Sequence, residues 1–395
     1  MEKKTIKDIQ TKGKRVLVRV DFNVPMDRST GEITDDSRIR ATLPTIEHLV
    51  NQGAKTILAS HLGRPDGKVV EKLRLAPVGE WLSKLLGRPV SCTRDCIGTG
   101  VEQAVNEMRE GDVILLENLR FYPEEEENDP QFSQSLARLA DIYVDDAFGA
   151  AHRAHASTVG VAQHLPAVAG LLMAKELGFL GKALANPDRP FAMVVGGAKV
   201  SDKIGLLENI MKKVDYLIIG GGMANTFLKA QGYNTGSSKV ELDHLESARK
   251  ILDKASNNSV HLLLPTDAVV AKEFSRESEH KTVPISEVPE DWMIMDIGPE
   301  TAAKFNEELT RCKTVVWNGT MGVFEFPPFA EGTRSIASSI AKLDAMTIIG
   351  GGDTAEAVVE LGLRDHISHI STGGGASLRF LEGKRLPGVK VLLDK

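Results

Sequence analysis

The sequence predicts an α/β protein built from two doubly wound, Rossmann-like domains with parallel sheets, and three observations support this class. Short β-rich runs alternate with longer helical patterns along the whole chain. These runs are continuously apolar rather than alternating, as expected for parallel strands that are covered on both faces. The chain has 395 residues, which is too long for one hydrophobic core and indicates two domains.

The predicted strands fall into two groups, and helices are expected between them. In the helix predicted at residues 37–51, for example, Ile39, Ile46 and Val50 lie on one apolar stripe. The strands expected in the first half of the chain are RVLVRV, KTILAS, DVILLEN and DIYVDDAF. Those expected in the second half are FAMVV, DYLIIG, VHLLLP, KTVVWN and MTIIGGG.

The boundary between the two domains is expected at residues 171–186. This stretch has a helical pattern and is followed by the breaker Asn-Pro-Asp-Arg-Pro, through which no helix continues. The expected domains are therefore residues 1–170 and 187–379, joined by a connecting helix. The acidic run at residues 124–127 is expected to be a solvated loop.

Composition and charge exclude several classes of protein. The net charge of -6 does not favour nucleic acid or an acidic membrane surface as a partner. The most apolar long segment, residues 165–185, is interrupted by Lys175 and Glu176, so it is not a membrane span. Cys92 and Cys96 have no second pair of cysteines beside them, which argues against zinc. Free thiols and the charged N-terminus are typical of a cytoplasmic protein.

The strands of the second half run into glycine-rich turns that lead into helices. Glycine permits positive φ and lets backbone N–H groups approach an anion, and a helix N-terminus adds about half a positive charge. One such turn is often only a tight strand–helix connection, but their recurrence in one domain favours a phosphate-rich ligand. The turns are VVGGAK, LIIGGGMAN, TIIGGGDTAEA and ISTGGGASL.

Charged residues at two of these turns indicate what the ligand carries. Lys199 and Lys203 follow the first turn, and Asp353 lies in the third. A carboxylate would repel phosphate unless a cation lay between them, and Mg²⁺ takes one or two carboxylates together with substrate oxygens. Alternatively, Asp353 caps the helix that begins near Thr354. Beside the other turns, a Mg-nucleotide is favoured. The fingerprint G-x-G-x-x-G is absent from the turns, which argues against a dehydrogenase.

The strand ends of the first half carry charge instead of glycine. A single arginine is more often part of a surface ion pair than a ligand contact. In an acidic chain, however, basic residues that recur after successive strands indicate a pocket for a small anion, and arginine binds phosphate and carboxylate in a bidentate manner. His152 and His155 flank one of these arginines without further metal ligands, so no zinc site is expected there. The strand-end residues are Asp21, Asn23, Arg38, His61, Arg64, Arg120 and Arg153.

The chain contains, in this order, the motifs RVDFNVP, SHLGRP, ENLRF, GAAHRAHAS, VGGAKVSDKI, GGGMANTF, WNGTMGVFE, GGDT and STGGGAS. In these motifs the chain resembles the phosphoglycerate kinase family over essentially its whole length. The resemblance implies two α/β domains of similar size that face each other across a cleft, with residues of about 380–395 returning to the first domain. It implies a hinge-bending cytoplasmic monomer that transfers a phosphoryl group reversibly from 1,3-bisphosphoglycerate to Mg-ADP, giving 3-phosphoglycerate and ATP.

The resemblance also implies roles for individual residues. The first domain would bind 3-phosphoglycerate through Asp21, Asn23, Arg38, His61, Leu62, Gly63, Arg64, Arg120 and Arg153. The second would bind the nucleotide through Lys203, Gly220, Gly221, Asn318, Glu325, Gly351, Gly352, Asp353 and Thr354. Asp353 would hold Mg²⁺, and the catalytic residues would be Arg38, Lys199, Gly373 and Gly374.

Two positions depart from the family pattern, and two other functions remain as alternatives. Thr320 stands where the family usually has proline, and Ala174 stands where it usually has glutamate. Neither change removes a group that the chemistry needs. The alternatives are an NAD-dependent dehydrogenase, which the missing fingerprint argues against, and a non-catalytic phosphometabolite-binding protein, which has no use for Lys199 together with Asp353.

Overall fold

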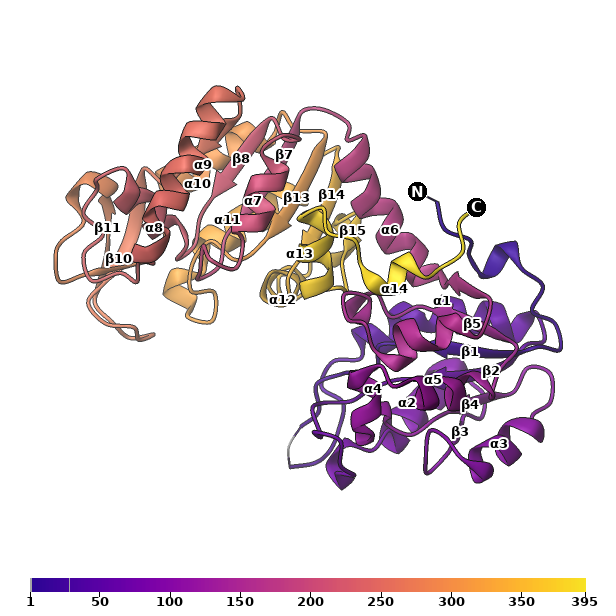
Figure 1. Ribbon diagram of the computed structural model, residues 1–395. Helices are drawn as coiled ribbons and strands as arrows, with labels where there is room; N and C mark the ends of the chain where they lie inside the picture. Colours follow the sequence, from indigo (N-terminus) through magenta and orange to yellow (C-terminus); the bar gives the residue numbers. More distant parts are fainter. Residues whose placement is uncertain (1, 28) are drawn as a thin grey trace. The chain divides into compact units, whose positions relative to one another are not determined.

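The computed structural model describes residues 2–27 and 29–395, which form two compact units. Unit 1 comprises the chain up to Gly178 together with Arg385–Lys395, and unit 2 comprises Phe179–Lys384. The chain passes from unit 1 to unit 2 within helix α6 (Leu171–Ala185) (Figure 1). The assignment of residues 1–170 and 187–379 to two functional domains stays a prediction.

Unit 1 is built on a six-stranded sheet in which every neighbouring pair is parallel. Its order, β3-β4-β2-β1-β5-β6, confirms the doubly wound class and all four strands expected from the first half. Strands β3 and β6 are not predicted from the sequence, because β3 has only two exposed residues and β6 consists of small residues. The strands are β1 Arg15–Arg19, β2 Lys55–Ala59, β3 Ser91–Cys92, β4 Val113–Leu115, β5 Ile142–Asp145 and β6 Ala167–Ala169.

The helices of unit 1 include one that the sequence analysis assigned wrongly. The acidic run expected to be a solvated loop forms helix α4 (Pro123–Glu127), and Glu125 is fully buried. Proline in the first turn and carboxylates near the N-terminus both favour a helix start. The other helices are α1 Ser37–Asn51, α2 Ala76–Leu86, α3 Thr99–Asn106, α5 Pro130–Ala137 and α14 Pro387–Lys390. The short 3₁₀ or π turns are η1 Ile6–Asp8, η2 Glu71–Leu73, η3 Leu119–Phe121, η4 Phe148–Ala150, η5 Ala156–Gly160 and η6 Val161–Gln163.

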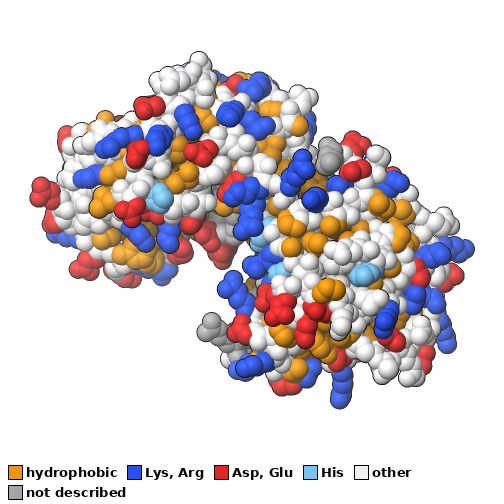
Figure 2. All heavy atoms as spheres, viewed as in Figure 1, with side chains coloured by type: hydrophobic (Ala, Val, Ile, Leu, Met, Phe, Trp, Pro, Cys, Tyr) orange, Lys and Arg blue, Asp and Glu red, His pale blue; other side chains and the backbone are white. Residues whose placement is uncertain are grey.

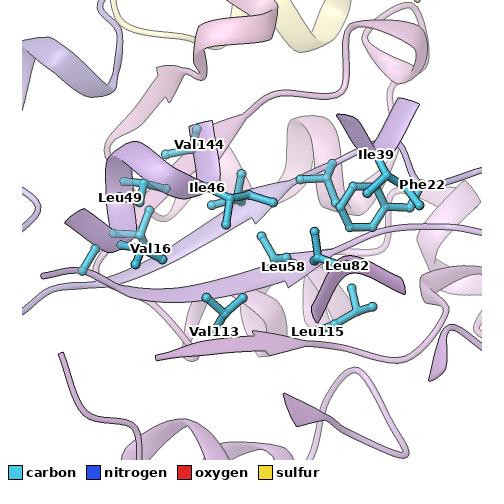
Figure 3. Close-up of a cluster of buried hydrophobic side chains, with 14 of the residues drawn as sticks. Val16, Phe22, Ile39, Ile46, Leu49, Leu58, Leu82, Val113, Leu115 and Val144 are labelled. Carbon is cyan, nitrogen blue, oxygen red and sulfur yellow. The ribbon is translucent and has the colours of Figure 1, made fainter. Parts of the chain in front are cut away.

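The core of unit 1 lies between α1, α2 and the sheet (Figure 3). Helix α1 contributes Ile39, Ile46 and Leu49, all fully buried, as its apolar stripe predicts. They pack with side chains that include Val16 and Leu58 from the central strands. Each such side chain stabilises the fold by about 1.5–3 kcal/mol relative to exposure. This packing fixes the position of α1, whose first turn carries Arg38.

The C-terminal segment of unit 1 contacts its N-terminus and the sheet. Figure 1 shows the two termini side by side, and Lys4 N donates to Leu393 O at 2.8 Å. Leu393 N donates in turn to Ala167 O at 2.9 Å on β6, and Gly388 N donates to Ala151 O at 2.9 Å. The chain end therefore completes unit 1.

Unit 2 contains a second six-stranded parallel sheet, of order β15-β14-β13-β7-β8-β9, and a small antiparallel sheet, β11-β10-β12. The five strands expected from the second half correspond to β7, β8, β9, β13 and β14. The antiparallel sheet is not predicted from the sequence. The parallel strands are β7 Phe191–Val195, β8 Tyr216–Ile219, β9 His261–Leu263, β13 Thr314–Asn318, β14 Met346–Gly350 and β15 His369–Ile370. The antiparallel strands are β10 Asp267–Ala271, β11 His280–Pro284 and β12 Met293–Ile297.

The helices of unit 2 are α7 Ile204–Ile210, α8 Ala224–Ala230, α9 Leu245–Asn257, α10 Pro299–Leu309, α11 Glu331–Ile340, α12 Gly352–Glu360 and α13 Gly375–Leu381. Five of them (α7, α8, α11, α12 and α13) come after strands of its parallel sheet, whereas α10 comes after β12 of the antiparallel sheet. The short turns are η7 Leu242–His244, η8 Ile285–Glu287, η9 Pro327–Phe329 and η10 Arg364–His366. None of the described helices is long and apolar enough to cross a membrane. In each parallel sheet all strands end at the same edge, where ligands bind in open α/β folds.

Candidate active site

The carboxyl end of β1 and the first turn of α1 meet at an ion pair in unit 1. Arg38 lies in that first turn, and its Nη1 is 2.7 Å from Asp21 Oδ2 just beyond β1. The Asp21 side chain is 11% exposed, whereas that of Arg38 is 36% exposed. Asn23 N donates to Asp21 Oδ1 at 3.2 Å and fixes the carboxylate. Asp21 thus orients the guanidinium, while part of it remains open to solvent and to an anion.

The loop after β2 is held by side chains from neighbouring strand ends. Asn23 Oδ1 accepts a hydrogen bond from Gly63 N at 2.8 Å, and Arg120 Nη1 donates to Gly63 O at 2.9 Å. Gly63 has a φ of +65°, which favours glycine. The side chain of Asn118 holds the backbone of Leu62, the residue before Gly63. It accepts a hydrogen bond from Leu62 N at 3.2 Å and donates one to Leu62 O at 2.8 Å. Three strand ends therefore define one loop conformation.

The remaining arginines of this edge differ in burial. Arg120 is 7% exposed, its Nε is 3.3 Å from Glu126 Oε1, and burial lowers the pKa of its guanidinium. It still remains charged, because arginine does not lose its proton in proteins. Arg64 and Arg153 are exposed, and Arg153 contributes to the lowered pKa of Arg120 by charge repulsion. The edge therefore concentrates positive charge.

A buried arginine that was not singled out from the sequence supports His61. Arg19 ends β1, is 1% exposed, and its Nη2 lies 3.1 Å from His61 Nδ1. Burial, followed by the charge of Arg19, lowers the pKa of His61 well below its ordinary value. The signal in the sequence is a charge inside the apolar run RVLVRV, which a fully buried strand does not tolerate without a partner.

In unit 2, Lys203 ties together the ends of two strands. Its Nζ donates to Gly196 O at 2.6 Å and to Asn318 O at 2.9 Å, beyond β7 and at the end of β13. Lys203 is only 9% exposed, and burial lowers the pKa of its ammonium group to about 8, against the opposing charges of Asp202 and Asp353. Lys203 is therefore a structural cation as well as a candidate phosphate ligand.

Several glycines of unit 2 are required because backbone segments approach each other closely. A Cβ on Gly319 would lie 2.6 Å from Lys203 Nζ and overlap the backbone of Gly196. A Cβ on Gly221 would lie 2.6 Å from Gly197 N, and one on Gly220 would lie 2.5 Å from Met321 Sδ. For Gly220 and Gly221, close packing therefore gives a sufficient reason for glycine, whether or not they also contact a nucleotide.

Other glycines of unit 2 border open space. A Cβ on Gly352, Gly374 or Gly375 would meet no neighbouring protein atom within 4 Å. Gly374 has a φ of +48°, and Gly373 N donates to Ser371 Oγ at 3.2 Å. Space beside bare backbone at the start of α12 and α13 is suited to the approach of an anion.

The turn after β14 presents one carboxylate beside this space. Asp353 is exposed in the first turn of α12, after Gly351, whose φ is +90°. Thr354 is buried, and its Oγ1 accepts from Gly319 N at 2.7 Å. The described residues contain no group of three or more His, Cys, Asp or Glu side chains that could hold a metal ion. A single carboxylate fits Mg²⁺ that takes its other ligands from substrate phosphate and water.

Lys199 and Glu325 lie in exposed loops of unit 2. The loop of Lys199 is anchored by Glu241, which the sequence did not indicate. Glu241 Oε2 accepts from Val200 N at 2.6 Å, and Glu241 Oε1 accepts from Ser201 Oγ at 2.6 Å. The anchor holds the loop and leaves Lys199 itself exposed.

The predicted site residues therefore form two sets. Hydrogen bonds and an ion pair join Asp21, Asn23, Arg38, Gly63 and Arg120 within unit 1. Hydrogen bonds join Lys203 with Asn318, and Gly319 with Thr354, within unit 2. The two candidate catalytic cations, Arg38 and Lys199, belong to different units.

Comparisons with known proteins agree over the whole chain. The family model "Phosphoglycerate kinase" matches residues 6–384. The chain is 58% identical to the phosphoglycerate kinases of Pelotomaculum thermopropionicum and Moorella thermoacetica, each over 395 residues and 100% of both chains. Among solved structures, the phosphoglycerate kinase of Coxiella burnetii is similar with a TM-score of 0.89 and 44% identity, and that of Pyrococcus horikoshii with 0.86 and 35%. Both matches cover 98% of each chain.

Proposed function

The chain belongs to the phosphoglycerate kinase family, and from this premise we propose how its two units divide the reaction. The chain is a phosphotransferase that moves a phosphoryl group reversibly between 1,3-bisphosphoglycerate and ADP, giving 3-phosphoglycerate and ATP. The two alternatives, a dehydrogenase and a non-catalytic binding protein, are not favoured by relatives that match along the full length.

Unit 1 binds the phosphoglycerate. The observation that carries this assignment is the network in which Asp21 holds Arg38 while Asn23 and Arg120 hold the loop of Gly63. Arg38 receives the carboxylate and the transferring group, and Asp21 and Asn23 hold the hydroxyl region. The phosphate that does not move is bound by His61, the backbone of Leu62 and Gly63, Arg64, Arg120 and Arg153.

Unit 2 binds the nucleotide. Lys203 lies at the strand ends with Asn318, and the backbone of Gly351 and Gly352, open at Gly352, receives phosphate at the N-terminus of α12. Glu325 binds the ribose, and Gly220 and Gly221 border the adenine. Gly373 and Gly374 approach the phosphoryl group in transfer, together with Lys199.

Asp353 is the residue that would hold Mg²⁺. Its carboxylate is exposed beside the open backbone of the turn, and no second carboxylate is required when phosphate oxygens complete the coordination. When bound, the ion neutralises negative charge on the phosphates.

The chemistry of transfer needs charge neutralisation rather than a general base. In the direction that consumes ATP, the attacking group is a carboxylate, which is already ionised at neutral pH. A loose phosphoryl-transfer transition state spreads negative charge over the equatorial oxygens. Arg38 stabilises this charge from the unit that binds phosphoglycerate, and Lys199 stabilises it from the unit that binds the nucleotide. His61 is neutral because its pKa is lowered, so it orients phosphate by hydrogen bonding.

Because the two residue sets belong to different units, transfer requires that the units bring their ligands together. The reacting atoms need to come within about 3–3.5 Å in a site closed to water. We expect hinge bending about α6 when both ligands are bound. Small-angle scattering should give a smaller radius of gyration with 3-phosphoglycerate and a non-hydrolysable ATP analogue than without ligands. An unchanged radius in an active preparation contradicts hinge closure.

The same proposal includes a monomeric, cytoplasmic enzyme of small-molecule substrates. Each residue set is built within one chain. Lysine and arginine side chains lie among aspartate and glutamate on the face shown in Figure 2. The net charge of -6 does not favour nucleic acid as a partner. Sedimentation at micromolar concentration tests the monomer.

The decisive experiment for the function is a coupled assay with ATP, Mg²⁺ and 3-phosphoglycerate. Turnover should depend on all three components and should fall by roughly 10²- to 10³-fold with Arg38→Ala. A matched control is Arg40→Ala, since Arg40 lies on the same helix and pairs with Asp36 at 2.8 Å. Absence of turnover in the wild type overturns the proposed function.

A further inference from the structure

A buried chain of four side chains runs behind the basic edge of unit 1. This relay consists of Glu125, Ser157, Arg19 and His61. Ser157 donates to both oxygens of Glu125, from Oγ at 2.6 Å and from N at 2.9 Å. Arg19 Nε donates to Ser157 Oγ at 2.8 Å, and Arg19 Nη2 lies 3.1 Å from His61 Nδ1. The four residues are between 0% and 6% exposed, so water does not compete for these hydrogen bonds.

The last contact of the relay determines which ring nitrogen of His61 carries the proton. The guanidinium of Arg19 has only donors. His61 Nδ1 must therefore accept, and an imidazolium, whose two nitrogens both donate, is excluded by the same geometry. The neutral ring that remains has its proton on Nε2.

Charges around His61 act in the same direction. Besides Arg19 on β1, the residues Arg120 from η3, Arg38 from α1 and His155 from the segment before η5 lower the pKa of His61 electrostatically. All of them, together with burial, oppose a further positive charge on the ring. The negative charge of Glu125 does not act directly on His61. Its carboxylate compensates Arg19 through Ser157, and its Oε1 lies 3.7 Å from His155 Nδ1.

We propose that Arg19 is a positioning residue that locks His61 as the neutral tautomer with its proton on Nε2, so that His61 is an uncharged hydrogen-bond donor to a phosphate oxygen. The part that concerns phosphate rests on the proposed function, whereas the tautomer does not. A neutral donor keeps its hydrogen bond over the whole range in which the enzyme works, and the arginines alone supply the charge. Glu125 and Ser157 hold Arg19 in place for this purpose.

The test is ¹⁵N NMR of the histidine rings in the full-length wild-type chain, with His61 assigned by comparison with His61→Gln. The expected spectrum has a protonated Nε2 and an unprotonated Nδ1, and it shows no titration of His61 between pH 5.5 and 8.5. A proton on Nδ1, or an imidazolium at pH 7, overturns the proposal. This result is independent of any ligand, and it uses His61→Gln only to assign the signals.

Two variants separate the role of Arg19 from a general effect of removing an arginine. In Arg19→Met, His61 should lose its fixed tautomer and titrate at least one pH unit higher than in the wild type. Arg15→Met is the matched control, because Arg15 lies on the same strand, pairs with Asp141 at 2.7 Å and should leave the His61 signals unchanged. Equal titration of His61 in wild type and Arg19→Met contradicts the role of Arg19.

Binding of 3-phosphoglycerate tests the functional half. In the wild type it should shift the His61 Nε2 resonance and leave the tautomer unchanged, and Arg19→Met should raise KM for 3-phosphoglycerate about tenfold, the size of one charge-assisted hydrogen bond, with little change in kcat. A fixed tautomer without any response to 3-phosphoglycerate, in an enzyme that turns over, overturns the donor role. Loss of turnover in the wild type is a different result and contradicts the proposed function instead.

Discussion

The two strand-end edges of this molecule solve similar problems with different chemical groups. In unit 1 the groups offered to a ligand are largely side chains, and some of them are held by another side chain, as Asp21 holds Arg38. In unit 2 they are largely backbone, brought close by glycines such as Gly319 and left open at Gly352. A side-chain site fixes charge at defined points, which suits a small rigid anion. A backbone site presents donors along a turn, which suits a chain of phosphates.

The two edges also differ in which charges can titrate. The cations of unit 1 are mainly arginines, which stay charged across the working range, and its buried His61 stays neutral because its pKa is lowered. In unit 2, burial brings the pKa of Lys203 to about 8. Removing a catalytic side chain of unit 1 should therefore lower kcat. In unit 2, replacing a glycine by alanine or raising the pH should lower the affinity for Mg-ADP.

The largest expected effect comes from Arg38→Ala. It should lower kcat by roughly 10²- to 10³-fold, because it removes a charge that acts on the transition state. Affinity for Mg-ADP should remain within about twofold of the wild type, because Arg38 belongs to unit 1. Calorimetric titration with Mg-ADP checks this separation. A loss of ADP affinity as severe as the loss of activity contradicts the division between the units.

Both parallel sheets could be predicted from the sequence for a physical reason, whereas the roles assigned to the residues at their edges stay a prediction. Buried parallel strands are continuous apolar runs, and the residues directly after each run lie at one edge of the sheet. The contacts behind the edge could not be predicted. Arg19 is visible as a charge in an apolar run, but nothing in the sequence indicates that its partner Ser157 lies 138 positions away.

The antiparallel sheet and α4 were missed for similar reasons. Asp267 begins β10 as a buried carboxylate whose Oδ1 accepts from Thr301 Oγ1 at 2.6 Å, so only a short apolar run remains to indicate a strand. Glu125 is buried because Ser157 satisfies both of its oxygens, whereas a run of glutamates by itself indicates a solvated segment. In both cases a tertiary partner reverses the local preference.

The next effect separates glycines that pack against protein from glycines that border open space. Gly319→Ala should reduce Mg-ADP affinity more than tenfold and destabilise the fold by on the order of 2–4 kcal/mol, because φ is +101° and a Cβ would press on Lys203 Nζ. Gly352→Ala should leave the unfolding temperature unchanged and weaken only Mg-ADP binding. Calorimetry of both variants, with and without nucleotide, makes the comparison. If Gly352→Ala destabilises the free protein, the distinction is wrong.

A moderate effect is expected from alkaline pH. As pH rises through about 8, the pKa of Lys203, this residue loses its proton and its charge, so Mg-ADP affinity should fall by up to tenfold per pH unit above that value. Affinity for 3-phosphoglycerate should stay constant from about pH 7 to 9, because the arginines of unit 1 remain charged. Titrations of both ligands on the same preparation provide the measurement and its internal control. A parallel loss of both affinities would assign the effect to the whole protein rather than to Lys203.

The smallest effect concerns stability and lies away from the ligands. Asp145, at the end of β5, is fully buried, and burial raises its pKa to about 8. Its Oδ1 accepts from Ala147 N at 3.0 Å, and within the described residues its Oδ2 has no hydrogen-bond partner. Between about pH 4 and 8 the folded state keeps the proton that the unfolded state has released. The folded state therefore binds more protons, and stability falls as pH rises through this window.

Asp145→Asn imitates the protonated carboxyl group. The variant should therefore lose the part of the slope of stability against pH that Asp145 contributes. We expect the drop in unfolding temperature between pH 5 and pH 8.5 to be clearly smaller in the variant, corresponding to about 1–3 kcal/mol less destabilisation. Asp253→Asn, at an exposed position of α9, is the control and should keep the wild-type slope. Unit 2 has its own buried carboxylate, Asp296, whose pKa is raised to about 7 by burial, so part of the slope should remain in Asp145→Asn. An identical slope in wild type and Asp145→Asn would mean that Asp145 is ionised in the folded protein. The pH sensitivity would then belong to other buried carboxylates, such as Asp146 of unit 1, whose pKa burial raises to about 6, and Asp296 of unit 2.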